Sequence, residues 1–116
     1  MYKYKAIVLE VLDAETVKVA IDLGFGIVTN QKVKLAGIDG SEFRDKKNPD
    51  KETELKKIIE DGLLRREVSL KSLKAEKSGR YLAFLYLDNE TKSFNDKLVE
   101  EGHIKGYVKR ESRIGK

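Results

Sequence analysis

The stretch Val33–Glu42, with the sequence VKLAGIDGSE, changes character within ten residues. Its first half alternates apolar side chains with Lys34, which is typical of a strand that buries one face. Its second half ends in Asp39 and Glu42, and Gly40 between them gives the backbone freedom to turn. The stretch therefore predicts a core strand whose end presents two carboxylates, with a cation on the strand itself.

Segments on both sides of this stretch favour further strands, because they are rich in Val, Ile and Leu and are bounded by turn residues. The short break DAE (13–15) fits a hairpin between the first two strands, and GFG (24–26) makes a second break before the third. Sequential strands with such short connections predict a twisted three-stranded meander. The predicted strands are Lys5–Leu12, Thr16–Leu23, Val28–Ile38, Glu67–Leu73 and Arg80–Leu87.

Two segments change to the helical period. Asn48 and Pro49 are typical of a helix start, and Gly62 is placed to end that helix. Ser93 is placed to cap a second helix, which Gly102 ends. The residues expected on the inward helical faces are Leu55, Ile58, Ile59, Leu63, Phe94, Leu98 and Val99. Five short strands with a helix after the third predict an α+β fold that is mainly β, a five-stranded OB-fold barrel with two helices.

The composition bounds the class of protein. A length of 116 residues without a low-complexity break predicts one domain over residues 1–116. The absence of cysteine excludes disulfides and thiolate metal sites, and no apolar run approaches the roughly 20 residues that cross a bilayer. The N-terminal segment lacks the apolar core of a signal peptide, so a cytoplasmic protein and a secreted protein whose signal has been removed both stay open.

The net charge of +4 is concentrated at the C-terminal end of the chain. Residues 103–116 carry five cations against Glu111, while residues 1–102 hold equal numbers of cations and anions. The basic tail, from about residue 109, favours a polyanionic partner, although a solubilising tail explains the same charge.

Carboxylates and cations gather in the predicted turns. Asp13 and Glu15 lie in the first hairpin turn, and with Asp39 they offer the hard oxygen ligands that Ca²⁺ or Mg²⁺ requires. Arg80 begins a strand after the KSGR turn, and together with Lys34 it is able to hold an anionic phosphate. Solvated turn acids and a structural ion-pair network explain the same residues more simply, and both interpretations stay open at this point.

Four pieces of the sequence resemble the staphylococcal nuclease (thermonuclease) family, and they follow the family's order and spacing from about residue 5 to residue 108. These pieces are VLDAETVKV (11–19), VKLAGIDGSE (33–42), EKSGRYLAFLY (76–86) and FNDKLVEEGHIKGYV (94–108). The family fold is an OB barrel with helices, the same architecture that the pattern of strands and helices predicts. The best-known member continues into a third, C-terminal helix, which is expected to be absent or truncated here.

The resemblance implies a Ca²⁺-dependent nuclease that hydrolyses phosphodiester bonds of DNA or RNA with low sequence specificity. It implies that Glu42 acts as general base and that Lys34 and Arg80 grip the phosphate. The implied Ca²⁺ ligands are Asp39, Glu15 and the carbonyl of Gly40. The implied nucleic-acid contacts are Lys77, Tyr107 and Lys109. DNA or RNA is thus the expected partner, no membrane is expected, and the expected state is a monomer.

The sequence departs from the family pattern in four ways that bear on the implied site, and one of them is that Ser78 and Lys109 stand where the family has aromatic residues that hold the nucleotide. Lys34 stands where the family has an arginine. The planar guanidinium group, which donates two hydrogen bonds to one phosphate, is therefore lost. Glu15 stands where the family has an aspartate and is longer by one methylene group, and GSE (40–42) lacks the family's proline before Glu42. These departures keep a second hypothesis open, a catalytically inactive nuclease-like module that binds nucleic acid or protein.

Overall fold

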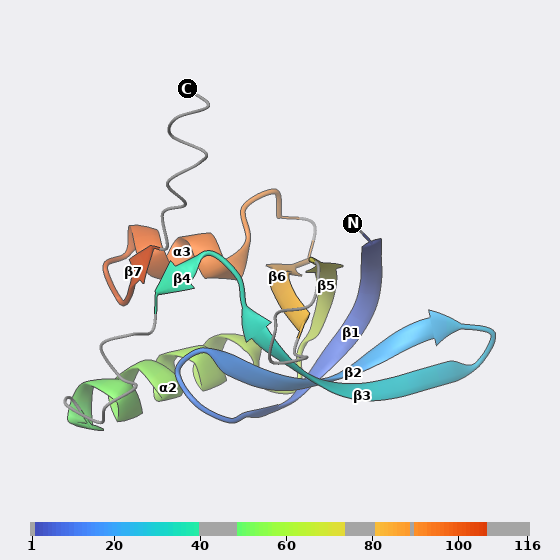
Figure 1. Ribbon diagram of the computed structural model, residues 1–116, viewed down its shortest axis with the longest axis horizontal. Coiled ribbons are helices and arrows are strands. Elements are labelled where there is room, and N and C mark those ends of the chain that lie inside the picture. Colours follow the sequence, from blue (N-terminus) through green and yellow to red (C-terminus); the bar gives the residue numbers. More distant parts are fainter. Residues whose placement is uncertain (1, 40–48, 74–80, 89, 107–116) are drawn as a thin grey trace.

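A closed barrel of five strands, with two helices outside it, organises the computed structural model, which describes residues 2–39, 49–73, 81–88 and 90–106 (Figure 1). The elements in chain order are β1 (Tyr2–Val11), β2 (Thr16–Gly24), β3 (Ile27–Leu35), β4 (Ile38–Asp39), α2 (Pro49–Leu63), β5 (Glu67–Ser72), β6 (Tyr81–Leu87), α3 (Phe94–Glu100) and β7 (Lys105–Gly106). The barrel has the strand order β1-β2-β3-β6-β5, and β4 pairs separately with β7. The predicted α+β fold, a five-stranded OB-fold-like barrel with two helices, is confirmed.

The core lies inside the barrel because the strands alternate buried and solvent-facing side chains. Val17, Val19 and Ile21 of β2 are buried, as are Val33 and Leu35 of β3. From α2 the buried side chains are Leu55, Ile59 and Leu63, which join the same cluster as the strand residues. Each fully buried aliphatic side chain contributes about 1.5–3 kcal/mol, so this helical face adds several kcal/mol to the stability of the core.

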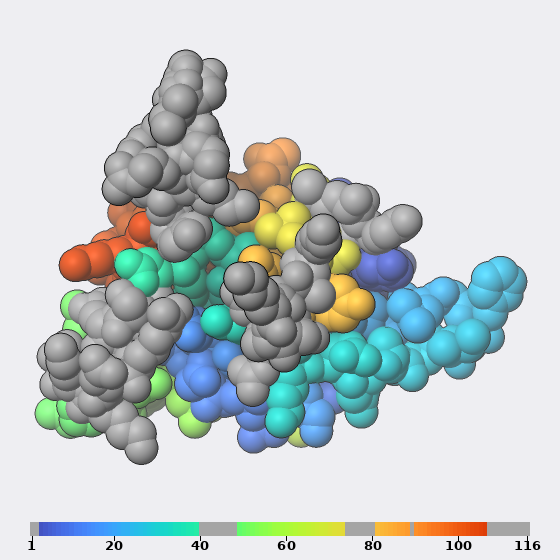
Figure 2. Space-filling view, viewed as in Figure 1, coloured from blue at the N-terminus to red at the C-terminus, as the bar shows by residue number. Residues whose placement is uncertain are grey.

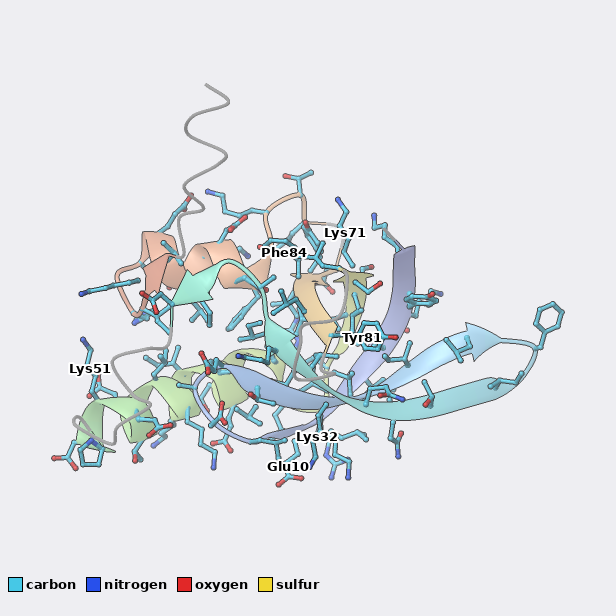
Figure 3. All side chains as sticks on the ribbon, viewed as in Figure 1. Glu10, Lys32, Lys51, Lys71, Tyr81 and Phe84 are labelled. Atoms are coloured by element: carbon cyan, nitrogen blue, oxygen red, sulfur yellow. The ribbon has the colours of Figure 1, made fainter. Side chains whose placement is uncertain are left out.

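The third strand ends earlier than the sequence predicts. The prediction of one strand through Ile38 is wrong, because β3 stops at Leu35 and Ile38 starts the separate strand β4. Gly37 turns the backbone with φ of 79°, and a Cβ there would lie 3.2 Å from Cε1 of Phe84. Figure 3 labels Phe84, which comes from β6. The aromatic ring and the glycine together redirect the chain, so that β4 leaves the barrel and pairs with β7.

Gly62 does not end the first helix, so that prediction is also wrong. Helix α2 continues to Leu63, and the left-handed residue that follows is Arg65, with φ of 66°. A Cβ on Gly62 would lie 2.5 Å from Cε1 of Phe94, which belongs to α3. The glycine is therefore required by the close packing of Phe94 against α2 rather than by the helix end.

Other turn and cap predictions are confirmed. The Oγ of Ser93 accepts a hydrogen bond from the Asp96 N–H at 3.0 Å, which caps α3. In the first hairpin turn the Glu15 N–H donates to Oδ1 of Asp13 at 2.9 Å. Helix α2 begins at Pro49, whereas its predicted cap Asn48 and the basic tail lie outside the described residues.

Within the described ranges, neither helix combines the length and the apolar composition that a bilayer crossing requires.

Candidate functional site

The barrel brings Glu15 and Lys34 together from separate parts of the chain. Thr16 at the start of β2 faces Lys34 of β3 in the antiparallel register, and the Leu35 N–H donates to the Glu15 carbonyl at 2.8 Å. As a result, the Nζ of Lys34 lies 3.9 Å from Oε1 of Glu15. The two side chains are 22% and 19% exposed, so this pair of opposite charges is partly shielded from water.

Strand alternation decides that Lys34 faces outward. Its neighbours Val33 and Leu35 are buried in the barrel, so the lysine side chain lies on the outer surface of β3. In the parallel pairing of β3 with β6, Val33 faces Tyr81 and Lys34 faces Leu82. The start of β6 therefore lies directly beside Lys34, and Leu82 is its neighbour across the two strands.

Asp39 lies at the end of the short strand β4. It faces Lys105 of β7 in the antiparallel register, and its side chain is half-buried. Because β7 follows α3 closely, Asp39 is held between the end of β3 and the segment after α3. Asp39 therefore belongs to the two-stranded sheet outside the barrel, whereas the sequence predicts that it directly follows a barrel strand.

Asn95 is a residue of this region that the sequence analysis does not single out. It is fully buried in α3, and its Nδ2 donates to the carbonyls of Ala36 at 2.8 Å and Ala83 at 2.9 Å. Its Oδ1 accepts the Leu85 N–H at 3.1 Å. The side chain thus ties α3 to β6 and to the residue that follows β3, two positions after Lys34. Its spacing of three from the inward-facing Leu98 is the sequence signal that predicts its burial.

The described carboxylates have the chemistry of Ca²⁺ ligands but do not by themselves form a complete set. Ca²⁺ takes about six to eight oxygen ligands, and Glu15 and Asp39 are able to supply hard carboxylate oxygens. In the part of the chain that the structure describes, no group of three or more His, Asp or Glu side chains gathers as a metal cluster. The donor type fits Ca²⁺, and a full coordination shell requires oxygens from residues beyond those described, or from water.

The remaining predicted site residues lie outside the described residues. This applies to the predicted general base, the second phosphate-binding cation, the carbonyl ligand and the nucleic-acid contacts, which are Glu42, Arg80, Gly40, Lys77, Tyr107 and Lys109. Their roles stay predictions. Of the predicted set, the structure describes Glu15, Lys34 and Asp39, and it brings the first two into an ion pair.

Comparison with known families supports the same interpretation of the fold. The profile of the family described as staphylococcal nuclease homologue matches residues 32–116, which is more than half of the chain. The match begins at the end of β3 and includes Lys34, Asp39 and Asn95, while Glu15 precedes it. No curated protein sequence gives a significant match. Membership of this family supports a nuclease-like function with a nucleic-acid substrate. The chain, with its five-stranded barrel and two helices, belongs to the staphylococcal nuclease homologue family.

Proposed function

We propose that this protein is a Ca²⁺-dependent nuclease that hydrolyses phosphodiester bonds of DNA or RNA with low sequence specificity. The observation that carries the proposal is the meeting of Glu15 and Lys34 on the outer face of the barrel, in a chain of the nuclease family. A carboxylate able to hold a cation and an ammonium able to hold a phosphate stand next to each other there. A bound cation and an ammonium group both assist the cleavage of a negatively charged backbone, because each stabilises the charge that builds up on the phosphate.

The ion site of the proposal consists of Glu15 and Asp39 with the carbonyl of Gly40. A bound Ca²⁺ would supply positive charge to the phosphate oxygens as negative charge builds up on them. In the proposal the two described carboxylates come from two places in the fold, the β1–β2 turn and the end of β4. A hard cation such as Ca²⁺ takes oxygen ligands, and two separate segments are able to supply them.

The chemical step is assigned to the chain's own charged side chains. Lys34 and Arg80 hold the phosphate and stabilise the charge on its equatorial oxygens. Glu42 accepts a proton from water while the water oxygen bonds to phosphorus and the bond from phosphorus to the leaving oxygen breaks. The two cations of the proposal come from segments that are neighbours in the barrel, since Lys34 lies on β3, Arg80 precedes β6 in the chain, and β3 pairs in parallel with β6.

Nucleic-acid contacts of the proposal are Lys77, Tyr107 and Lys109. The two lysines neutralise phosphates, and the tyrosine ring provides a surface on which a base stacks. Stacking accepts every base, which agrees with low sequence specificity.

Cleavage of a fluorogenic single-stranded DNA or RNA is expected with Ca²⁺ and is expected to be abolished by EGTA. Ca²⁺ is also expected to raise the melting temperature, because a ligand that binds only the folded state stabilises it. Asp39→Asn should remove most of this rise, since it takes away a negatively charged ligand. The matched variant Glu54→Asn, at an exposed position on α2, should keep the rise. A Ca²⁺-induced rise that is equal in wild type and Asp39→Asn would contradict the ion site.

A second function is favoured by the ion pair between Glu15 and Lys34. Each group partly neutralises the other, so both are less available for a metal ion and a phosphate. On this alternative the barrel is a catalytically inactive module that binds nucleic acid through its cations. Polynucleotide binding that weakens with salt, without any turnover, would identify this function.

The double variant Lys34→Arg with Glu15→Asp tests which function holds. We expect the cleavage rate to rise about tenfold or more, because arginine binds phosphate with two donors and a 1 Å error in position costs about a hundredfold. Single-turnover kinetics with excess enzyme measures the chemical step. The control is Lys32→Arg, since Lys32 lies on the same strand and face two residues earlier. An unchanged rate in the double variant would favour the binding module.

A further inference from the structure

The hairpin of β2 and β3 extends beyond the barrel, as Figures 1 and 2 show at the right of the view. The stretch Leu23–Gln31 that forms its outer part contains no charged residue, in a chain where 38% of the residues are charged. Its tip, Leu23–Val28, carries apolar side chains that are exposed, and Phe25 is exposed to 101% of its reference area. The hairpin is therefore an apolar surface on an otherwise highly charged molecule.

Phe25 has an unfavourable backbone conformation, and its exposed side chain makes no contact that stabilises the barrel. Its φ is 57°, in the left-handed region that an aromatic residue rarely adopts, and it lies between Gly24 with φ of 83° and Gly26 with φ of 76°. The side chain is fully exposed, so burial within its own chain does not offset this unfavourable backbone. An exposed aromatic ring on a two-glycine turn is best explained by burial against another surface.

The base of the same hairpin forms part of an open cavity of about 360 Å³. We call it the barrel mouth, and it is lined mainly by inward-facing side chains at the ends of the strands, which include Tyr4, Ile21, Leu23, Thr29, Val33 and Tyr81. Figure 3 shows Tyr81 beside the base of the hairpin. Leu23 belongs both to the mouth and to the hairpin tip, so the projecting ring and the cavity lie on one continuous apolar surface.

We propose that this surface binds a second copy of the chain, with the hairpin tip of each copy seated on the barrel mouth of the other. A symmetric dimer requires one patch that is complementary to itself, and a projecting apolar tip beside an apolar cavity meets this condition. The proposal replaces the sequence-based expectation of a monomer. The projecting tip lies away from the proposed nuclease site, at the opposite end of β2 and about 25 Å from Glu15, whereas the mouth includes Val33, the neighbour of Lys34 in the chain.

The exposed area of one hairpin tip is too small for a stable dimer interface, so the proposal requires that both tips are buried. With exposures of 44%, 54% and 61% for Leu23, Ile27 and Val28, and a fully exposed Phe25, one tip presents about 450 Å². Two tips together present about 900 Å², and the mouths that they cover add a smaller area. The reciprocal arrangement therefore passes the roughly 1,000 Å² that a specific interface needs, and a single contact does not.

Charge favours a second copy as the occupant. The stretch Leu23–Gln31 has no cation for a nucleic acid, and two copies meeting through it bring no like charges together.

Sedimentation velocity of the full chain between about 1 and 200 μM tests the proposal, with dimers expected at the upper end. Phe25→Asn should weaken association about thirtyfold or more, as the loss of a central aromatic contact does. It should also raise the melting temperature at 1 μM, because asparagine accepts the left-handed conformation that phenylalanine resists. Tyr81→Thr should weaken association as well, since the mouth is half of each contact.

The matched control is Ile7→Thr, because Ile7 is an exposed apolar residue on β1 outside both the tip and the mouth. This variant should associate like wild type, and Phe25→Asn should keep whatever cleavage activity the wild type has. A wild type that stays monomeric at 200 μM would overturn the proposal, as would equal association of wild type and Phe25→Asn. Cosedimentation of a monomeric wild type with phosphatidylserine vesicles would instead assign the tip to a lipid surface.

Discussion

Glu42→Gln is expected to lower the cleavage rate by about a hundredfold to ten-thousandfold. Glutamine has nearly the same shape as glutamate but does not accept the proton of the attacking water, and general base catalysis contributes a factor of this size. Binding of the nucleic acid should change little, because the substitution removes a negative charge and no phosphate contact. The measurement is single-turnover cleavage at saturating Ca²⁺, with binding followed separately by fluorescence anisotropy.

The control for this experiment is Glu54→Gln, which removes the same charge from an exposed position on α2 and should cleave at the wild-type rate. Glu42→Gln should also keep the Ca²⁺-induced rise in melting temperature, since Asp39, Glu15 and Gly40 hold the ion in the proposal. If wild type and Glu42→Gln are equally inactive at high enzyme concentration while both bind DNA, the protein is a binding module.

Asn95→Leu is expected to destabilise the fold by about 3 kcal/mol. Leucine has the same branched outline as asparagine, so the change mainly removes three hydrogen bonds rather than opening a cavity. The Leu85 N–H loses the acceptor that Asn95 provides, and the Ala36 carbonyl loses a donor, in a fully buried place. A buried polar group without a partner costs about 1–3 kcal/mol, which sets the expected total.

Urea unfolding measures this effect, and Ser93→Ala is the comparison within the same helix. Ser93 is also buried, but its side chain makes one helix-capping hydrogen bond, so its loss should cost about 1 kcal/mol. An Asn95→Leu variant as stable as Ser93→Ala would show that the three bonds of Asn95 do not hold the strands together. In the proposed function the hydrogen bonds of Asn95 matter because they fix the chain two residues after Lys34 and three residues after Arg80.

The sequence predicts the parts of the fold that depend on neighbours in the chain. Alternation around Lys34 places its side chain outside the barrel, and turn chemistry places Glu15 in a hairpin with Asp13. The cap at Ser93 and the break at residues 24–26 follow from local preferences in the same way. Each of these features depends on residues within about four positions, where the physical rules are simple.

The two predictions that the structure contradicts, a helix end at Gly62 and a continuous strand through Ile38, fail for the same reason. Gly62 resembles a helix end, but its small size is required by Phe94, which lies 32 positions later in the chain. The strand through Ile38 looks continuous, but Gly37 and Phe84 divide it. In both cases the deciding neighbour is distant in sequence, so no local pattern contains it.

The amino-acid sequence by itself determined the order of the five barrel strands and the two helices, the barrel class, the sides of the strands that are buried and the charged residues available for a site. Only the tertiary structure decided that Lys34 meets Glu15, that Asp39 leaves the barrel on β4, and that Asn95 joins α3 to Ala36 across 59 positions. The physical reason is that alternation and capping are satisfied within a few residues. Side-chain contacts between elements depend instead on the register and closure of the whole barrel.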